Sequence, residues 1–317
     1  MGRRLGQHFL ARKSILENIA AAACPEAKGT HAADAIAEGV AERAAGLGAE
    51  ASRAEADGAP GHDVVGSRSE AGGAEISGAE SHGGGAAARG RVIEIGPGRG
   101  ALTECLLERA EQVTAIEIDP VLVHYLRQKF RDALADGRLA LIEGDVLKTD
   151  VTAVLGGGRA AITGNLPYYI TSPILQRVFS LGAAWVRGVF LVQAEVAARL
   201  AAAPGSRDYG FLSVLAQVQA RAEVLFPVAR TAFRPPPKVD SAVILLEPRA
   251  VAQVGDVDGF LRFASACFRH KRKTLRNNLA AVYGRERLEG VEEGRLRAEQ
   301  MSVADLAALR AKLEAGA

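Results

Sequence analysis

The feature that most constrains the fold is a regular alternation of short apolar runs with helical stretches, which begins at residue 92. Residues 92–95 (Val-Ile-Glu-Ile) form an apolar run that ends at a glycine, as a buried strand does. Further strands are expected at 113–118, 139–142, 160–163 and 186–192, and helices at 101–109, 120–130, 171–181 and 193–202. Strands that alternate with helices predict an α/β fold, a mostly parallel sheet with helices on both faces.

Changes in composition divide the chain into four segments. Residues 1–24 are expected to form a basic arm that runs into a helix, with Ser14 as its N-cap. Residues 25–90 are mostly Ala, Gly, Glu, Ser and Arg, and they bury too little apolar surface to offset the entropy of ordering, so a low-complexity, flexible insertion is expected there. Residues 91–250 carry the sheet, which ends with a β-like pair. Residues 251–317 have a helical pattern and predict a small all-α C-terminal domain.

The charge is unevenly distributed along the chain. Eleven acidic and five basic residues lie between Glu26 and Arg89, so the rest of the chain has a net charge of +8, although the whole chain carries only +2. A basic body is compatible with a phosphate-bearing partner. The scattered Cys24, Cys105 and Cys267 indicate neither a disulfide framework nor a zinc site, and no apolar run is long enough to span a membrane. We therefore expect a cytoplasmic protein with no membrane partner.

A glycine-rich loop joins the first strand to the following helix over residues 94–100, Glu-Ile-Gly-Pro-Gly-Arg-Gly. Glycines let the backbone turn tightly and approach a ligand closely, and a helix N-terminus offers free N–H groups. Taken alone, the loop could be an ordinary turn. Glu117, however, follows about 20 residues later at the end of the next strand, where a carboxylate can accept both hydroxyls of a ribose. Asp145 ends the third strand, close to the expected place of a cofactor's adenine ring.

The charges of this loop favour S-adenosylmethionine over a dinucleotide. Its spacing is GxGxG and lacks the GxGxxG register of nicotinamide enzymes. Glu94 would repel a pyrophosphate, whereas it can help to hold a cationic or amino-acid-bearing ligand. S-adenosylmethionine has both a sulfonium and an α-amino group, so we expect it to be the cofactor.

The most specific signal is the run that follows the fourth strand, Asn165-Leu166-Pro167-Tyr168. The N6 amine of adenine is a poor nucleophile because its lone pair is delocalised into the ring. The Asn165 side-chain oxygen and the Leu166 carbonyl can accept hydrogen bonds from the two N–H groups of this amine, and Tyr168 offers a flat face for stacking of the base. A capping Asn, a Pro turn and a core Tyr are the alternative, which the preceding glycine loop and Glu117 disfavour. The run predicts methyl transfer to adenine.

With these motifs the sequence resembles the ribosomal RNA adenine dimethyltransferases, class I methyltransferases with a Rossmann-like sheet, and within them the bacterial group that modifies small-subunit rRNA. The matching stretches are 6–10 (Gly-Gln-His-Phe-Leu), 94–100, 116–119, 165–168, 233–243 (Phe-Arg-Pro-Pro-Pro-Lys-Val-Asp-Ser-Ala-Val) and 272–277. The resemblance covers residues 1–24 and about 90–310. It implies dimethylation of the N6 amine of two adjacent adenosines near the 3′ end of 16S rRNA, by a monomer acting on a pre-ribosomal 30S particle.

The resemblance also implies roles for individual residues. The cofactor, without a metal, would contact His8, Leu10, Gly96, Glu117, Asp145 and Asn165. The catalytic residues would be Asn165, Leu166, Tyr168 and Phe233. Tyr168 and Phe233 would lie on either side of the target adenine; the alternative for Phe233 is a buried loop anchor. The sequence departs from the family at position 8, which is His where many relatives have Asn, and in its insertion of about 60 residues before the first strand.

A basic segment near the C-terminus is the expected RNA contact. Between residues 268 and 279 no acidic residue accompanies the cations Arg269, Lys271, Arg272, Lys273 and Arg276. On a helix these residues would form a broad positive surface suited to phosphates. An ordinary solvated helix face is the alternative.

Two other functions remain open from the sequence. Methyltransferases that act on adenine N6 in large-subunit rRNA or in DNA share the asparagine motif. A non-catalytic small-subunit assembly factor could also use the same fold as a scaffold.

Overall fold

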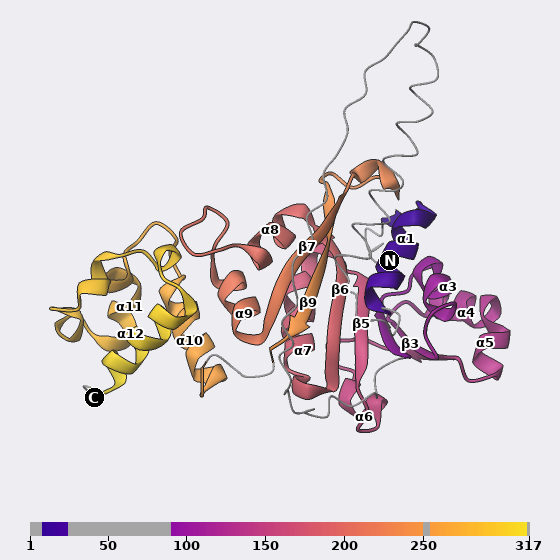
Figure 1. Ribbon diagram of the computed structural model, residues 1–317, viewed down its shortest axis with the longest axis horizontal. Helices are drawn as coiled ribbons and strands as arrows, with labels where there is room; N and C mark the ends of the chain where they lie inside the picture. Colours follow the sequence, from indigo (N-terminus) through magenta and orange to yellow (C-terminus); the bar gives the residue numbers. More distant parts are fainter. Residues whose placement is uncertain (1–7, 25–89, 250–253, 316–317) are drawn as a thin grey trace, which may run out of the picture. The chain divides into compact units, whose positions relative to one another are not determined.

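The computed structural model describes residues 8–24, 90–249 and 254–315, and within them a seven-stranded sheet is the central element (Figure 1). From one edge to the other its strands are β4 (Leu139–Glu143), β3 (Gln112–Glu117), β2 (Arg91–Ile95), β5 (Ala160–Asn165), β6 (Trp185–Gln193), β9 (Ser241–Pro248) and β7 (Ala220–Val228). Strands β2 to β6 are parallel to one another, and β9 is antiparallel to both β6 and β7. The predicted mostly parallel sheet is confirmed. The expected insertion at 25–90 lies, except for Gly90, outside the described residues.

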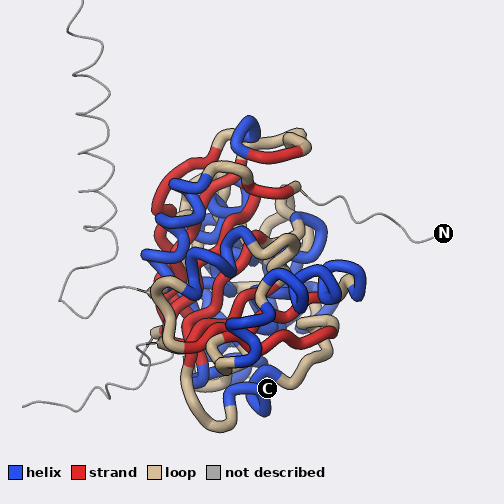
Figure 2. Tube along the Cα trace, turned by 90° about the vertical axis from the view of Figure 1, so that its right-hand side faces the viewer, coloured by secondary structure: helices blue, strands red, loops and turns tan. Residues whose placement is uncertain are grey.

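Helices cover both faces of this sheet, as the two views in Figures 1 and 2 show. They are α1 (Lys13–Ala23), α3 (Ala101–Leu107), α4 (Pro120–Lys129), α5 (Arg131–Ala135), α6 (Val151–Leu155), α7 (Thr171–Phe179), α8 (Ala194–Ala201) and α9 (Phe211–Gln219). The core beneath them combines strand residues such as Ile162 and Phe190 with helix residues such as Leu175 and Leu200, all at most 1% exposed. The chain therefore has the expected Rossmann-like α/β architecture.

The N-terminal arm forms a separate two-stranded sheet. Strand β1 (Phe9–Leu10) pairs antiparallel with β8 (Phe233–Arg234), and the Ala11 N–H continues the ladder by donating to the Ala232 carbonyl at 2.9 Å. Helix α1 begins directly afterwards, with Arg12 as its N-cap. The expected N-cap at Ser14 is wrong, because the ladder holds the chain extended only as far as Ala11 and the Arg12 carbonyl already accepts the first helical bonds.

The C-terminal part is helical, as predicted. It consists of α10 (Val257–Cys267), α11 (Leu275–Tyr283), α12 (Val303–Ala315) and three short 3-10 turns between the last two helices. These helices share a hydrophobic core in which Phe260, Leu275 and Leu306 meet Val214 and Val218 of α9. Helix α9 thus links the C-terminal helices to the sheet. Throughout the described ranges, each helix is too short or too polar to cross a lipid bilayer.

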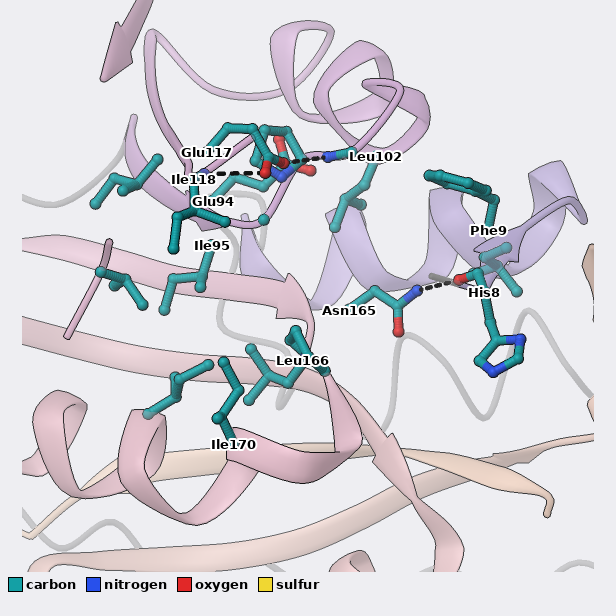
Figure 3. Close-up of a pocket in the computed structure, with 18 of the residues that line it drawn as sticks. His8, Phe9, Glu94, Ile95, Leu102, Glu117, Ile118, Asn165, Leu166 and Ile170 are labelled. Carbon is teal, nitrogen blue, oxygen red and sulfur yellow. Dashed lines mark hydrogen bonds between the residues drawn. The ribbon is translucent and has the colours of Figure 1, made fainter. Parts of the chain in front are cut away.

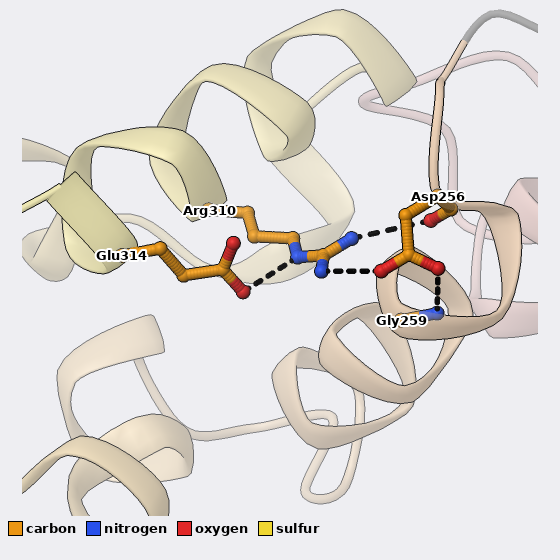
Figure 4. Close-up of polar contacts among 4 residues, drawn as sticks. All are labelled: Asp256, Gly259, Arg310 and Glu314. Atoms are coloured by element: carbon orange, nitrogen blue, oxygen red, sulfur yellow. Dashed lines mark hydrogen bonds and ion pairs between the residues drawn. The ribbon is translucent and has the colours of Figure 1, made fainter.

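An arginine on α12 fastens the first turn of α10 (Figure 4). Asp256 caps α10 by accepting the Gly259 N–H at 3.0 Å. Arg310 donates to the Asp256 carboxylate at 2.8 Å and to its backbone carbonyl at 3.2 Å, and it also pairs with Glu314 at 2.8 Å. The contact fixes where the C-terminal helices begin after the sheet.

Phe260→Ala is expected to destabilise the protein by about 3 to 5 kcal/mol, because it opens a cavity in the core that α9 and α10 share. Phe260 is 1% exposed. Val282→Ala is the matched control, since Val282 lies on α11 with 61% of its surface exposed and its loss should change the free energy of unfolding by less than about 0.5 kcal/mol. Urea unfolding of both variants measures the difference, and similar losses would contradict this description of the core.

Candidate functional site

A cavity of about 510 Å³ opens at the carboxyl ends of β2, β3 and β5 (Figure 3). Its wall combines the arm residues 8–10, the glycine loop at 96–99, Glu117 and Ile118 at the end of β3, Asp145 after β4, and residues 165–170 at the end of β5. In parallel α/β sheets ligands bind at this edge, where loops from neighbouring strands converge. The volume lies in the range of small-molecule and cofactor sites.

The glycine loop leaves free space beside its backbone. Gly96 and Gly98 have φ values of +66° and +59°, which side-chain-bearing residues rarely adopt. A Cβ atom on Gly96 would meet no atom within 4 Å, so this part of the backbone borders the open cavity. A Cβ atom on Gly98 would lie 3.1 Å from the ring of Phe9. The loop therefore permits close approach on the cavity side and tight packing of the arm on the other.

Glu117 is held by three backbone N–H groups. One carboxylate oxygen accepts from Gly98 at 3.0 Å, and the other accepts from Ile118 at 2.9 Å and Asp119 at 3.0 Å. The residue is 3% exposed, and its burial raises the pKa of the carboxyl, although these N–H groups oppose the rise. The carboxylate has a fixed orientation beneath the loop and can accept hydrogen bonds from hydroxyl groups of a ligand.

Glu94 is a second acidic residue on the same wall. It is 1% exposed and accepts a hydrogen bond from the Thr103 hydroxyl at 2.6 Å. Burial raises the pKa of Glu94 to about 7; the bond from Thr103 opposes this rise and the nearby charge of Glu117 adds to it. A cationic ligand would favour the ionised form, because a positive charge nearby stabilises a carboxylate.

The opposite wall carries the asparagine motif. The Asn165 amide nitrogen donates to the His8 carbonyl at 3.1 Å, and Figure 3 shows the amide oxygen turned away from that contact. The Leu166 N–H donates to the Leu191 carbonyl at 3.0 Å, which fixes the turn after β5. The Tyr168 hydroxyl is hydrogen-bonded to the Ser241 hydroxyl at 2.7 Å. These bonds set a hydrogen-bond acceptor beside a fixed aromatic face.

His8 connects this wall to the loop between β8 and β9. Its Nδ1 lies 2.9 Å from the Pro235 carbonyl. Its ring is stacked with that of Tyr168, with centroids 6.2 Å apart and planes inclined by 26°. The arm thus contributes the His8 ring on the Tyr168 side of the cavity and the Phe9 ring on the glycine-loop side.

Residues 88–311 match the family model described as "Ribosomal RNA adenine dimethylase". The chain belongs to this family. The match covers more than half of the chain and includes the glycine loop, Glu117 and the asparagine motif.

Relatives within this family share much of the sequence. The chain is 46% identical to "Ribosomal RNA small subunit methyltransferase A" of Acidobacterium capsulatum over 70% of this chain and 81% of the relative. It is 42% identical to the protein of that name from Chlorobium chlorochromatii over 68% of this chain and 80% of the relative. A dimethyladenosine transferase from Plasmodium falciparum superposes with a TM-score of 0.59 and 27% identity over 70% of this chain and 88% of the other. The 23S rRNA methyltransferase ErmE superposes with a TM-score of 0.51 and 28% identity, over 71% of this chain and 91% of the other.

The cavity brings together most of the residues that the sequence predicted for a dimethylase site. Those on its wall are His8, Leu10, Gly96, Glu117, Asp145, Asn165, Leu166 and Tyr168. Phe233 is not among the lining residues: it is 2% exposed and pairs with Leu10 in the β1–β8 ladder. The structure therefore does not place Phe233 opposite Tyr168 on the cavity wall, and its base-stacking role stays a prediction.

Three residues contribute to the site without having been predicted. Phe9 packs on Gly98 and lies beneath the Arg99 guanidinium, 5.3 Å from its ring centre. Thr103 holds Glu94, and Ser241 holds Tyr168. Phe9 and Ser241 fall in stretches that resemble the family, which was the available signal, whereas Thr103 is one of several polar residues on a helix and had none.

The basic C-terminal segment is not the helix that was expected. Residues 268–274 form a turn between α10 and α11, so Arg269, Lys271, Arg272 and Lys273 lie on an exposed loop. Arg276 lies on α11, half-buried. The prediction of a single positive helix face is wrong, because Asn278 accepts the His270 N–H and donates to the Cys267 and His270 carbonyls, which stabilises the turn. The RNA-binding role of these residues stays a prediction.

Glu94→Gln is expected to change how the stability of the free protein depends on pH. A carboxyl with a raised folded-state pKa contributes stability that is complete below its unfolded value of 4.5 and is lost as the pH rises through about 7. The wild type should therefore lose about 3 kcal/mol relative to the Gln variant over this interval. Thermal unfolding of both proteins from pH 4.5 to 8 measures the difference, and parallel stability curves would contradict it.

Proposed function

We propose that this protein uses S-adenosylmethionine to dimethylate the N6 amines of two adjacent adenosines near the 3′ end of 16S rRNA. The observation that carries the proposal is the joint placement of Asn165 and Tyr168 on the wall of the cavity that also contains Glu117. Membership of the adenine dimethylase family supports the reaction type. The relatives at 46% and 42% identity, both named small-subunit methyltransferases, support the substrate.

The residues of the cavity fit S-adenosylmethionine, which when bound supplies a sulfonium-activated methyl group. Glu117 is oriented to accept ribose hydroxyls, and Gly96 leaves its backbone open to the ligand. Buried Glu94 matches the positive charge of the amino acid part. The residues that would contact the cofactor or frame its pocket are His8, Leu10, Gly96, Glu117, Asp145 and Asn165.

The chain's own contribution to the chemistry is to prepare and align the amine. The side-chain oxygen of Asn165 and the Leu166 carbonyl would each accept one N–H of the adenine amine, which directs the nitrogen lone pair toward the methyl carbon. Tyr168 would stack on the base, contributing about 1–3 kcal/mol. After transfer the nitrogen releases a proton to water, so no strong general base is needed. Alignment of the reacting atoms carries most of the rate enhancement.

The target adenine must leave its base stack to enter this cavity, which favours a loop or strained hairpin as substrate. We propose that residues 251–317 help to hold the RNA through Arg269, Lys271, Arg272, Lys273 and Arg276, whose contacts with phosphates position the substrate. The natural partner would be rRNA within a pre-ribosomal 30S particle, bound by a monomer in the cytoplasm. A large-subunit activity, suggested by the weaker likeness to ErmE, is the second candidate.

Asn165→Ala should reduce methyl transfer to undermethylated small subunits by at least about a hundred-fold, since the amine loses an oriented acceptor in the transition state. The variant should retain affinity for RNA. The assay uses labelled S-adenosylmethionine, digestion of the rRNA and detection of N6,N6-dimethyladenosine. Full activity of the variant would reject the proposed role of Asn165. Failure of the wild type to label these subunits, with the cofactor shown to bind, would reject the proposed reaction.

Phe233→Ala tests the predicted base-stacking role against the buried position of this residue. A stacking residue would lower turnover more than binding of S-adenosylmethionine, because it touches only the base. A buried anchor of the β1–β8 ladder would lower both, since the arm also borders the cofactor side. Calorimetric binding of the cofactor and steady-state turnover, measured on the same variant, distinguish the two. Equal losses would remove Phe233 from the base pocket.

A further inference from the structure

The β1–β8 ladder assembles a group of exposed cations from two distant parts of the chain. Phe9 pairs with Arg234, and the ladder continues to Ala11 and Ala232. Arg12 follows this ladder directly as the N-cap of α1, and Arg230 lies two residues before Ala232. The side chains of Arg12, Arg230, Arg234 and Lys238 are all exposed. We call these four residues the rim cations.

Two of the rim cations are connected through short segments to residues on the Tyr168 side of the cavity. Arg234 directly precedes Pro235, whose carbonyl lies 2.9 Å from the His8 ring nitrogen, and that ring is stacked with Tyr168. At the other end of the same loop, Lys238 lies three residues before Ser241, which is hydrogen-bonded to the Tyr168 hydroxyl. The segment that follows Arg234 and contains Lys238 is therefore connected at both ends to the rings of His8 and Tyr168, and Arg230 lies four residues before Arg234.

The charges of the rim cations are largely uncompensated. None of the ion pairs formed between described residues involves any of the four. Neighbouring Lys13, in contrast, is 3.7 Å from Glu17. The one carboxylate recorded against this loop, Asp240, accepts the backbone N–H of Arg230 at 2.8 Å and so shapes the loop. Exposed arginines without carboxylate partners are suited to bidentate contacts with phosphate.

We propose that the rim cations bind the phosphates that flank the target adenosine. The inference rests on the proposed function and extends it by assigning a second RNA contact, made by other elements than the C-terminal turn. We expect a base stacked on Tyr168 to leave the phosphates of its own nucleotide outside the cavity, where the exposed cations of the adjoining segments would meet them. Contacts at this point fix the extruded nucleotide, whereas the C-terminal cations hold RNA farther along the chain of nucleotides.

The first test measures the affinity of the full-length protein, without cofactor, for a synthetic RNA hairpin whose loop carries two adjacent adenosines, over a range of salt concentrations. Arg230 and Arg234 are replaced together by Gln. The slope of the logarithm of the association constant against the logarithm of the salt concentration should become less steep by about 1.4, because each lost phosphate contact on a single strand accounts for about 0.7. An unchanged slope overturns the proposal.

The matched control replaces Arg127 and Arg131 by Gln. These cations are also exposed, but they lie on α4 and α5, which contact β4 at the sheet edge opposite to the β7–β9 edge that carries the rim loop. The slope for this control should equal that of the wild type. An equal fall in both double variants would show a general effect of net charge and would also overturn the proposal.

A second test locates the contact on the RNA. Uncharged methylphosphonate linkages are placed on either side of the target adenosine, and binding is compared for wild type and Arg234→Gln. The methylphosphonate linkages and Arg234→Gln should each weaken binding when made alone. Made together, they should weaken binding by no more than about two-fold beyond the larger of the two single effects, because both remove the same contact. Fully multiplicative losses would place Arg234 away from these phosphates and overturn the assignment.

The outcomes separate this inference from the proposed function. If the wild type binds the hairpin with a slope that depends on Arg230 and Arg234 but transfers no methyl group to undermethylated small subunits, the proposed function fails and the RNA contact stands. If it methylates those subunits while the slopes of all proteins are equal, the proposed function stands and the rim cations have no such role.

Discussion

The site depends on one constraint, the convergence of neighbouring parallel strands at a single edge of the sheet. Because β2 lies between β3 and β5, the glycine loop after β2 has Glu117 on one side and Asn165 on the other. The carboxylate of Glu117 then fastens the loop through the Gly98 N–H. Glu117 and Asn165, which come from different strands, thus line one cavity.

The N-terminal arm joins the two halves of this cavity. Phe9 packs on the glycine loop, the His8 carbonyl accepts the Asn165 amide, and the β1–β8 ladder ties both to the loop before β9. Three stretches that are far apart in the sequence therefore meet at residues 8–10. The same ladder carries Arg234, one of the cations that we propose to bind phosphates of the RNA. The proposed cofactor contacts of the arm and this proposed RNA contact therefore have a common support.

Local patterns predicted the sheet, the glycine loop, Glu117 and the asparagine motif, because each is specified by residues that are near one another in the chain. The remainder depended on distant contacts. The burial of Phe233 follows from its pairing with Leu10, 223 positions away, which no periodicity reveals. The basic segment from Arg269 to Lys273 reads as helical from its composition, but the Asn278 side chain stabilises a turn there. Thr103 holds Glu94 only because α3 returns against the sheet, where it contacts β3 beside β2, and the sequence does not distinguish Thr103 from other helix residues.

We propose that a purine stacks on Tyr168 with its amine held by the asparagine motif. A crystal structure of the protein with S-adenosylhomocysteine and an RNA hairpin carrying the two adenosines tests this claim most directly. It should show the N6 nitrogen about 3 Å from both the Asn165 side-chain oxygen and the Leu166 carbonyl, directed at the sulfur of the cofactor product. An adenine bound elsewhere, or a base pocket filled by the protein's own side chains in that complex, would contradict the claim.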